Sequence, residues 1–195
     1  MRVGLRPIDL ERHSVELLPL YSDPVAMKFI GGQTMEDAGA VRLFLERRLK
    51  RCGAPPLGFW AVEERGTKAV IGTALLDHPP ISSTQADPVR MSSDVQIGLA
   101  LRQDRWRFGY GRELGLALLD YAVHTCRLNT LIALAEPEHR VSVHLMETLG
   151  FTFDGETHDY YGGIAMYRYS LVLPRDEAAV LGDDRGVGSK IFVGE

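Results

Sequence analysis

The sequence predicts an α/β domain over residues 1–173, followed by a C-terminal tail over residues 174–195. Segments whose apolar residues alternate at every second position are interspersed with segments whose apolar residues recur every three or four positions, so strands and helices share one chain. The second half has the order strand, helix, strand, helix, strand, strand. From Pro174 onward the residues are polar and Gly-rich without a period, which is typical of a tail that is flexible or docks on a partner.

The N-terminal third predicts one short strand and three helices. Asp9 suits a helix N-cap, because its carboxylate can accept hydrogen bonds from first-turn amides. Asp23 and Pro24 mark a second helix start, since proline is favoured at the first helical position. Thr34 is the expected start of a third helix, with Asp37 three residues later in an acidic variant of the capping box. The predicted elements are a strand at 3–6 and helices at 10–21, 24–29 and 34–52.

The middle of the chain predicts a hairpin, a long loop and another strand. Residues 59–63 and 70–76 are apolar and β-branched, and the polar turn around Gly66 between them suits an antiparallel hairpin. Residues 78–92 are rich in Pro, Ser and Asp and have no period, which predicts a surface loop. Residues 94–101 are expected to form the next strand.

The second half contains the most regular patterns. Leu145 and Leu149, four residues apart, give one predicted helix its buried stripe, and Gly150 suits its end because glycine readily adopts the left-handed conformation found there. The predicted elements are helices at 110–126 and 138–149 and strands at 130–135, 151–155 and 164–172.

Composition excludes several classes of protein. Cys52 and Cys126 lie far apart and form no C-x-x-C pair, which argues against a disulfide scaffold or a zinc ribbon and for a reducing compartment; no metal is expected. The net charge of −4 argues against a nucleic-acid partner. No apolar run approaches the roughly 18 residues of a membrane span, and the N-terminus lacks a secretory signal, so we expect no membrane partner and a cytoplasmic location.

Residues 106–113, Trp-Arg-Phe-Gly-Tyr-Gly-Arg-Glu, fall between a predicted strand and a predicted helix. Gly109 and Gly111 allow a tight turn and a close approach of the backbone, and the amides at the helix start then face an anion. This arrangement predicts a site for a diphosphate. A dinucleotide-binding fingerprint is the rival interpretation, but its first glycine would follow the strand directly, whereas seven residues separate Leu101 from Gly109.

Several segments, taken in order, resemble the GNAT superfamily of coenzyme A-dependent N-acetyltransferases, in the branch of the ribosomal-protein N-terminal acetyltransferases RimJ and RimL. The resemblance spans about residues 3–173. It is carried by Leu5-Arg6-Pro7, Asp23-Pro24 through Gly32, Phe59-Trp60-Ala61-Val62, Val70-Ile71-Gly72, Ile97-Gly98-Leu99, Trp106-x-x-Gly109-Tyr110-Gly111-x-Glu113, and Ser142 followed by Leu149-Gly150-Phe151.

This resemblance implies a mixed, mostly antiparallel sheet, flanked by helices, that splays open at a bulge near Leu99 and admits acetyl-CoA. Backbone groups of Leu99, Ala100 and Leu101 would bind the pantetheine amides and polarise the thioester carbonyl. The implied binding residues for the remaining cofactor are Trp106, Arg107, Phe108, Gly109, Tyr110, Gly111 and Arg112 in the loop, and His139 and Ser142.

The resemblance also implies catalytic roles. Ser142 would supply a proton to the departing thiolate. The usual Glu-Asn-x-x-Ser motif has His139 in place of the asparagine, and its imidazole could donate a hydrogen bond or titrate, since its ordinary pKa is about 6.5. The central strand carries Gln96 where the family often has a glutamate base. Asp159 is the expected base; the alternatives are His158, then Asp94 and Glu136.

The expected reaction is direct acetyl transfer to a primary amine, either a peptide N-terminus or a small molecule. Because Gln96 cannot accept a proton, an amine of low pKa is favoured. The acceptor pocket is expected to include Phe29 through Gly32, Trp60, Gln96, the loop at 78–92, Tyr160 and Tyr161. A catalytically silent coenzyme A sensor and transfer of a longer acyl group are the alternatives, and a homodimer is possible in any of these cases.

Overall fold

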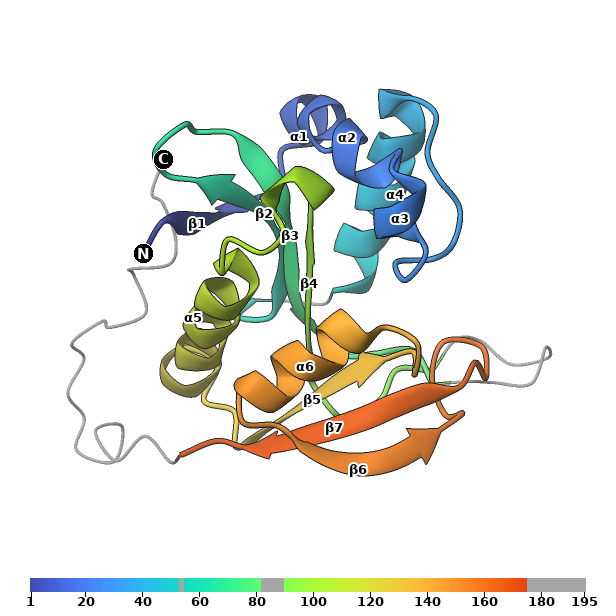
Figure 1. Ribbon diagram of the computed structural model, residues 1–195, viewed down its shortest axis with the longest axis vertical. Coiled ribbons are helices and arrows are strands. Elements are labelled where there is room, and N and C mark those ends of the chain that lie inside the picture. Colours follow the sequence, from blue (N-terminus) through green and yellow to red (C-terminus); the bar gives the residue numbers. More distant parts are fainter. Residues whose placement is uncertain (53–54, 82–89, 175–195) are drawn as a thin grey trace.

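The computed structural model describes residues 1–52, 55–81 and 90–174 and shows one seven-stranded sheet in the order β1-β2-β3-β4-β5-β7-β6. All neighbouring strands are antiparallel except β4 and β5, which run parallel. This confirms the predicted mixed, mostly antiparallel sheet (Figure 1). The strands are β1 (Val3–Pro7), β2 (Gly58–Glu64), β3 (Val70–Asp77), β4 (Gln96–Leu101), β5 (Thr130–Ala135), β6 (Thr152–Thr157) and β7 (Met166–Val172).

The helices match the predictions in the second half and differ in the first. They are α1 (Leu10–Glu16), α2 (Leu18–Tyr21), α3 (Pro24–Met27), α4 (Ala38–Arg51), α5 (Tyr110–His124) and α6 (Arg140–Thr148), with a 3-10 turn, η1, at Gln103–Arg105. The helix expected at 10–21 is interrupted at Leu17, because Pro19 has no N–H with which to continue the helical ladder. Asp9 and Asp23 cap α1 and α3 as predicted.

The start of α4 was predicted wrongly. Asp37, not Thr34, is the N-cap, and its carboxylate accepts a hydrogen bond of 2.8 Å from the amide of Ala40. The amide of Met35 instead donates to the carbonyl of Tyr21 at 2.8 Å. This tertiary contact holds the segment before Asp37 out of the helix.

Two apolar cores cover the opposite faces of β1–β4. Trp60 belongs to the core that contains Leu114 and Leu118 of α5, whereas its neighbour Ala61 belongs to the core that contains Leu45 of α4. The alternation follows from the two-residue period of a strand. In Figure 1, α1–α4 accordingly lie together on one side of the sheet and α5 and α6 on the other.

The sheet divides between its two parallel strands. The only register pair between β4 and β5 in the described chain is Gln96 with Ile132, so the strands diverge beyond this point. The expected splay is therefore present, but the expected bulge near Leu99 is not, because β3 and β4 remain in unbroken register from Asp77–Gln96 to Gly72–Leu101. The pairing with β3 keeps β4 regular, and the opening arises from β5 turning away.

The predicted loop at 78–92 lies partly outside the described residues. In the described part, isolated bridges join Pro80 to Met91 and Ile81 to Tyr160. Most of the predicted tail, residues 175–195, also lies outside the described chain. Within residues 1–52, 55–81 and 90–174, no helix is long and apolar enough to cross a bilayer.

Candidate active site

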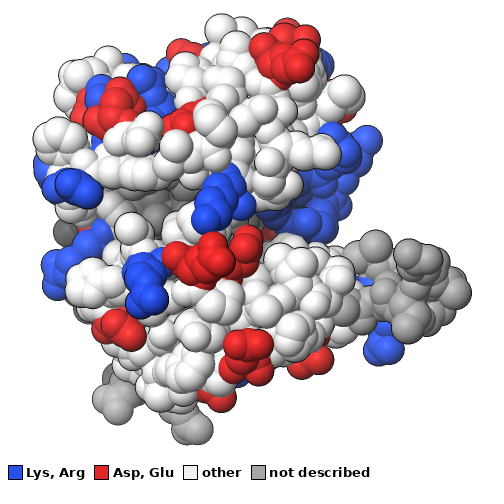
Figure 2. All heavy atoms as spheres, turned by 45° about the vertical axis from the view of Figure 1, so that its right-hand side comes forward, with Lys and Arg blue, Asp and Glu red and all other residues white. Residues whose placement is uncertain are grey.

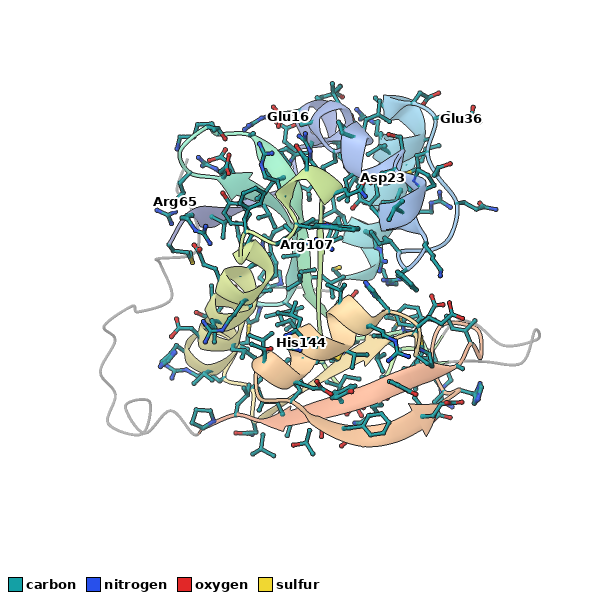
Figure 3. All side chains as sticks on the ribbon, viewed as in Figure 1. Glu16, Asp23, Glu36, Arg65, Arg107 and His144 are labelled. Carbon is teal, nitrogen blue, oxygen red and sulfur yellow. The ribbon has the colours of Figure 1, made fainter. Side chains whose placement is uncertain are left out.

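The connection between β4 and α5 is a tight loop with strained backbone. Arg107 and Gly109 both have positive φ values, 65° and 80°, a conformation that costs a residue with a side chain about 1–2 kcal/mol. The indole N–H of Trp106 donates to the carbonyl of Leu101 at 2.7 Å, and its amide donates to Gln103. Both N–H groups of Trp106, which was expected among the cofactor-binding residues, therefore bond within the protein and anchor the loop. Figure 3 places Arg107 between the end of β4 and the start of α5.

The amides of residues 107–112 have no hydrogen-bond partner among the described residues. Gly109, the N-cap of α5, offers no side chain to them, and the first bond of the helix runs from the amide of Glu113 to the carbonyl of Gly109. Free amides at the positive end of a 15-residue helix form an anion site. The loop has the geometry of an anion site, and its binding of a diphosphate stays a prediction.

Contacts from the N-terminus hold this loop in place. Arg2 donates to the carbonyl of Phe108 at 2.9 Å and pairs with Glu113 at 2.8 Å. The hydroxyl of Tyr110 donates to Glu64 of β2. The loop is thereby attached to the N-terminus and to β2. These contacts use side chains and one carbonyl of the loop, so the amides of residues 107–112 stay free.

The start of α5 packs close to α6 and β4. A Cβ on Gly111 would lie 3.5 Å from Cδ2 of Leu145 and 3.9 Å from Cδ1 of Leu99, so α5, α6 and β4 meet here. Ser142 lies one turn before Leu145 on the same face of α6. It is partly exposed, and its hydroxyl has no hydrogen-bond partner in the described chain. Ser142 is thus placed near this meeting point with an unused hydroxyl.

His139, at the N-terminal end of α6, packs against the segment that follows α3. Its ring stacks on that of Phe29 with centroids 4.0 Å apart and an interplanar angle of 7°. Beside the stack, Lys28 pairs with Glu138 at 3.1 Å. Burial, and secondarily the charge of Lys28, lower the pKa of His139, so the imidazole is neutral at pH 7. Figure 2 shows basic and acidic side chains next to one another near the middle of the face in view.

Gln96 lies at the closed end of the splay in a buried polar cluster. Its Nε2 donates to Oδ1 of Asp77 at 2.6 Å and to the hydroxyl of Tyr161. Asp77 is fully buried, and Gln96 is 4% exposed. Burial raises the pKa of Asp77, while Gln96 and Arg51 oppose this shift; burial also raises the pKa of Tyr161 to about 12.

Sequence reasoning did not identify Asp77 or Arg51 as site residues, whereas Tyr161 was expected in the acceptor pocket. Asp77 ends an apolar strand, and only its register opposite Gln96 reveals its position. Tyr161 comes from the loop between β6 and β7, where it adopts a φ of 51°. The register of the β3–β4 pair is the signal that could have identified Asp77.

The other predicted acceptor residues are dispersed. Asp159 is exposed and hydrogen-bonded to Thr157, without a described contact to Gln96. Tyr160 is buried and donates to Asp94 at 3.1 Å. Trp60 packs against Tyr121 of α5, on the face of the sheet opposite to Asp77. In the described residues, no group of three or more His, Cys, Asp or Glu side chains is arranged to hold a metal.

Comparisons with known proteins agree with this geometry. The acetyltransferase (GNAT) domain family matches residues 2–152. The chain is 26% identical over 175 residues to the uncharacterized N-acetyltransferase p20 of Bacillus licheniformis, covering 88% of this chain and 93% of that protein.

Solved structures share the fold. An acetyltransferase of the GNAT family from Bacillus anthracis has a TM-score of 0.67 at 18% identity, covering 88% of this chain and 95% of that one. The spermidine N-acetyltransferase of Vibrio cholerae, in complex with CoA and spermine, has a TM-score of 0.65 at 16% identity with the same coverage. With a family match over most of its length and a sheet that splays between β4 and β5, the chain belongs to the GNAT acetyltransferase family.

Proposed function

We propose that the protein transfers an acetyl group from acetyl-CoA directly to a primary amine. The observation that carries this proposal is the set of free amides at residues 107–112, located where β4, α5 and α6 meet. These amides would bind the diphosphate, with Arg107 and Arg112 adding charge. Each charge-assisted hydrogen bond contributes about 1.5–3 kcal/mol.

The remaining residues have complementary roles. Beyond Gln96, the side of β4 that faces β5 has no register partner in the described sheet, so the backbone groups of Leu99 and the amide of Leu101 are available to the pantetheine arm, whereas the carbonyl of Leu101 already accepts the indole N–H of Trp106. Bound acetyl-CoA supplies the activated acyl group. The hydroxyl of Ser142 holds the proton that a departing thiolate requires.

Direct transfer is favoured because the chain offers no thiolate nucleophile in its described part. Burial raises the pKa of Cys52 to about 12 and that of Cys126 to about 11. Both thiols therefore stay protonated at neutral pH and are poor nucleophiles. The amine itself has to attack the thioester.

The acceptor we propose is an amine of low pKa. An α-amino group is roughly 10–15% neutral at pH 7, whereas a lysine amine is only about 0.04% neutral. Gln96 cannot deprotonate an ammonium group, which favours the former. A peptide N-terminus fits the resemblance to the RimJ and RimL branch, and the spermine bound to the Vibrio cholerae neighbour supports a small-molecule amine.

A thiol-release assay with acetyl-CoA tests this function. The panel pairs a peptide having a free N-terminus and a blocked lysine with the same peptide blocked at the N-terminus and free at the lysine, and adds spermine. We expect the free N-terminus to react faster than the lysine. Calorimetric binding of CoA without thiol release from any amine would favour the sensor alternative, and absence of CoA binding would refute the proposed site.

Two further properties are proposed on sequence grounds alone. They are a homodimer, which light scattering of the purified protein tests, and a cytoplasmic location, which cell fractionation tests.

A further inference from the structure

The buried cluster at the closed end of the splay forces one orientation on Gln96. Asp77 and Gln96 are register partners on β3 and β4, and their side chains are joined by the 2.6 Å hydrogen bond from Nε2 to Oδ1. A carboxylate has only acceptor atoms, so the amide has to present its nitrogen to Asp77. The hydroxyl of Tyr161 takes the second N–H. The amide oxygen Oε1 has no partner among the described residues.

The carboxylate of Asp77 is itself held from a second side. Its Oδ2 lies 3.4 Å from Nη2 of Arg51 and 3.6 Å from Sγ of Cys52, both at the end of α4. These donors leave Oδ1 to Gln96. The titratable groups that face Asp77 are thus Arg51 and Cys52 from α4 and Tyr161 from the β6–β7 loop.

Backbone contacts hold Tyr161 in place. Its amide donates to the carbonyl of Pro80 at 3.2 Å, and the preceding residue, Tyr160, pairs with Ile81. Its left-handed φ of 51° is a conformation that non-glycine residues rarely keep unless surrounding contacts impose it. Strain of this kind concentrates at functional sites.

The cluster lies where an acceptor would approach. Gln96 is the first residue of β4 and the one residue of the described strand that has a register partner in β5, and the loop with the free amides begins beyond Leu101, at the other end of β4. Five steps along the strand span about 17 Å, which is comparable to an extended pantetheine arm. An acyl group carried by this arm would end near Gln96.

We propose that Asp77 is a positioning residue for the amine acceptor, holding Gln96 so that its Oε1 accepts a hydrogen bond from an N–H of the amine. The inference rests on the proposed amine acetylation and names the group that receives the acceptor. An ammonium or amine donates N–H groups, so an oriented amide oxygen recognises it without taking a proton. Gln96 thus offers the amine a hydrogen-bond acceptor, as a glutamate would, and Asp77 fixes the orientation of its amide.

Kinetics of D77N against the amine of highest turnover in the panel test this role. The amide that this substitution introduces can present either an oxygen or a nitrogen to Gln96, so the orientation is lost. We expect the KM for the amine to rise about tenfold, as for one lost hydrogen bond to a charged group, while the KM for acetyl-CoA stays unchanged. The double variant D77N/Q96E should restore the amine KM, because a carboxylate at position 96 always presents an oxygen.

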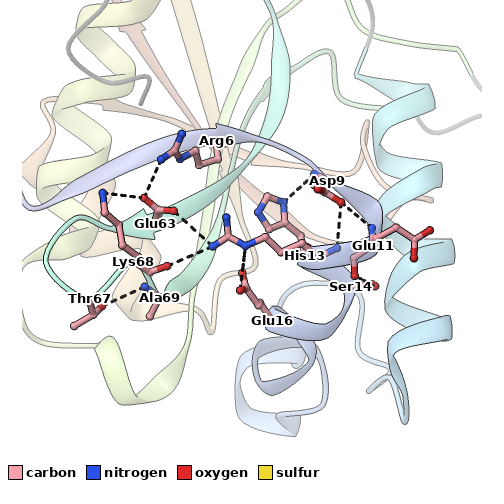
Figure 4. A network of polar contacts seen from close by, with 11 residues as sticks. Arg6, Asp9, Glu11, His13, Ser14, Glu16, Glu63, Thr67, Lys68 and Ala69 are labelled. Carbon is pink, nitrogen blue, oxygen red and sulfur yellow. Dashed lines mark hydrogen bonds and ion pairs between the residues drawn. The ribbon is translucent and has the colours of Figure 1, made fainter. Parts of the chain in front are cut away.

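Glu63 provides a matched control. It is the other buried acidic side chain in the described residues, at 2% exposure, and it pairs with Arg6, Arg12 and Lys68 at the far end of β2 (Figure 4). The same isosteric change, E63Q, should lower the melting temperature and leave the amine KM unchanged. An unchanged amine KM in D77N, equal rises in D77N and E63Q, or no recovery in D77N/Q96E would overturn the proposal.

A measurement on the ligand-free protein separates this inference from the proposed function. The side-chain NH2 resonances of Gln96, assigned by their loss in Q96E, should exchange slowly with solvent and shift as Asp77 titrates above its ordinary value of 3.8. Both properties should disappear in D77N. Resonances that are the same in D77N and wild type would refute the positioning role even if amines are acetylated, and their loss in D77N supports it even if no amine reacts.

Discussion

A methyl group added at Gly111 should stabilise the free protein and weaken its binding of coenzyme A. Gly111 is in the first turn of α5, and an added Cβ would make only ordinary contacts, at 3.5 Å to Leu145 and 3.9 Å to Leu99. Replacing a helical glycine by alanine contributes about 0.5–1 kcal/mol. For a protein of this size, the melting temperature should rise by about 1–4 °C.

The same methyl group should interfere with the anion site. In a helix, Cβ is tilted toward the N-terminus, so in G111A it would cover part of the amide face at residues 107–112. Loss of one charge-assisted hydrogen bond, about 1.5–3 kcal/mol, raises the Kd for CoA about 10- to 150-fold. Calorimetry measures this Kd, and a thermal melt of the ligand-free protein measures the stability.

Gly115, one turn further along α5, is the matched control. A Cβ there would lie 2.6 Å from Cδ1 of Leu149, so the Leu149 side chain has to shift. Overpacking of this kind costs about 1–3 kcal/mol; after the gain in helix propensity, G115A should lose up to about 2 kcal/mol of stability. Its Kd for CoA should stay at the wild-type value. An unchanged Kd in G111A, or a larger loss of affinity in G115A, would refute the assignment of the anion site.

Three other substitutions probe separate parts of the molecule. S142A should lower kcat about 100-fold, the lower end for loss of a general acid, with an unchanged Kd for CoA; an unaltered kcat would remove Ser142 from the reaction. Burial lowers the pKa values of His139 and His13 below the ordinary value of 6.5. The folded protein therefore favours the neutral imidazoles, and the stability that they contribute is complete above pH 6.5 and is lost as the pH falls below it. Melting temperatures measured from about pH 7 to 5.5 should therefore fall, and should fall less in H139N; equal slopes would contradict the burial of His139. E63Q should lower the free energy of unfolding by about 1–3 kcal/mol, measured by urea denaturation, and an unchanged value would show that the three cations lose nothing when their shared partner becomes neutral.

The parts of the fold that sequence reasoning predicted best are those with local causes. β5 matches its prediction at both ends, and α5 begins at the predicted residue because Gly109 and Gly111 mark the turn before it. The turn at residues 106–109 is likewise contiguous in sequence, so a tight loop with free amides could be expected from residue types alone. The helix at 10–21 and the start of α4 were wrong where a single proline and one contact from Met35 to Tyr21 outweighed the apolar period.

The acceptor side could not be predicted because its residues meet only through tertiary structure. Asp77 reaches Gln96 through strand register, and Tyr161 reaches it from a loop 65 residues away. The stack of Phe29 on His139 joins α3 to the turn before α6, which no local pattern indicates. The expected bulge in β4 was also wrong, since its pairing with β3 decides the geometry of this strand.

This division between local and non-local residues bears on how the activity could vary among related chains. In the proposed function, a diphosphate is bound mainly by backbone amides, so changes at side chains that do not hold the turn should be tolerated. The proposed recognition of the amine, in contrast, depends on a side-chain cluster whose members support one another: without the carboxylate of Asp77, nothing in the described cluster prevents Gln96 from turning its nitrogen outward. An exchange of Gln96 for glutamate is therefore expected to succeed only together with a neutral residue at position 77, because two buried carboxylates at hydrogen-bond distance cannot both stay ionised.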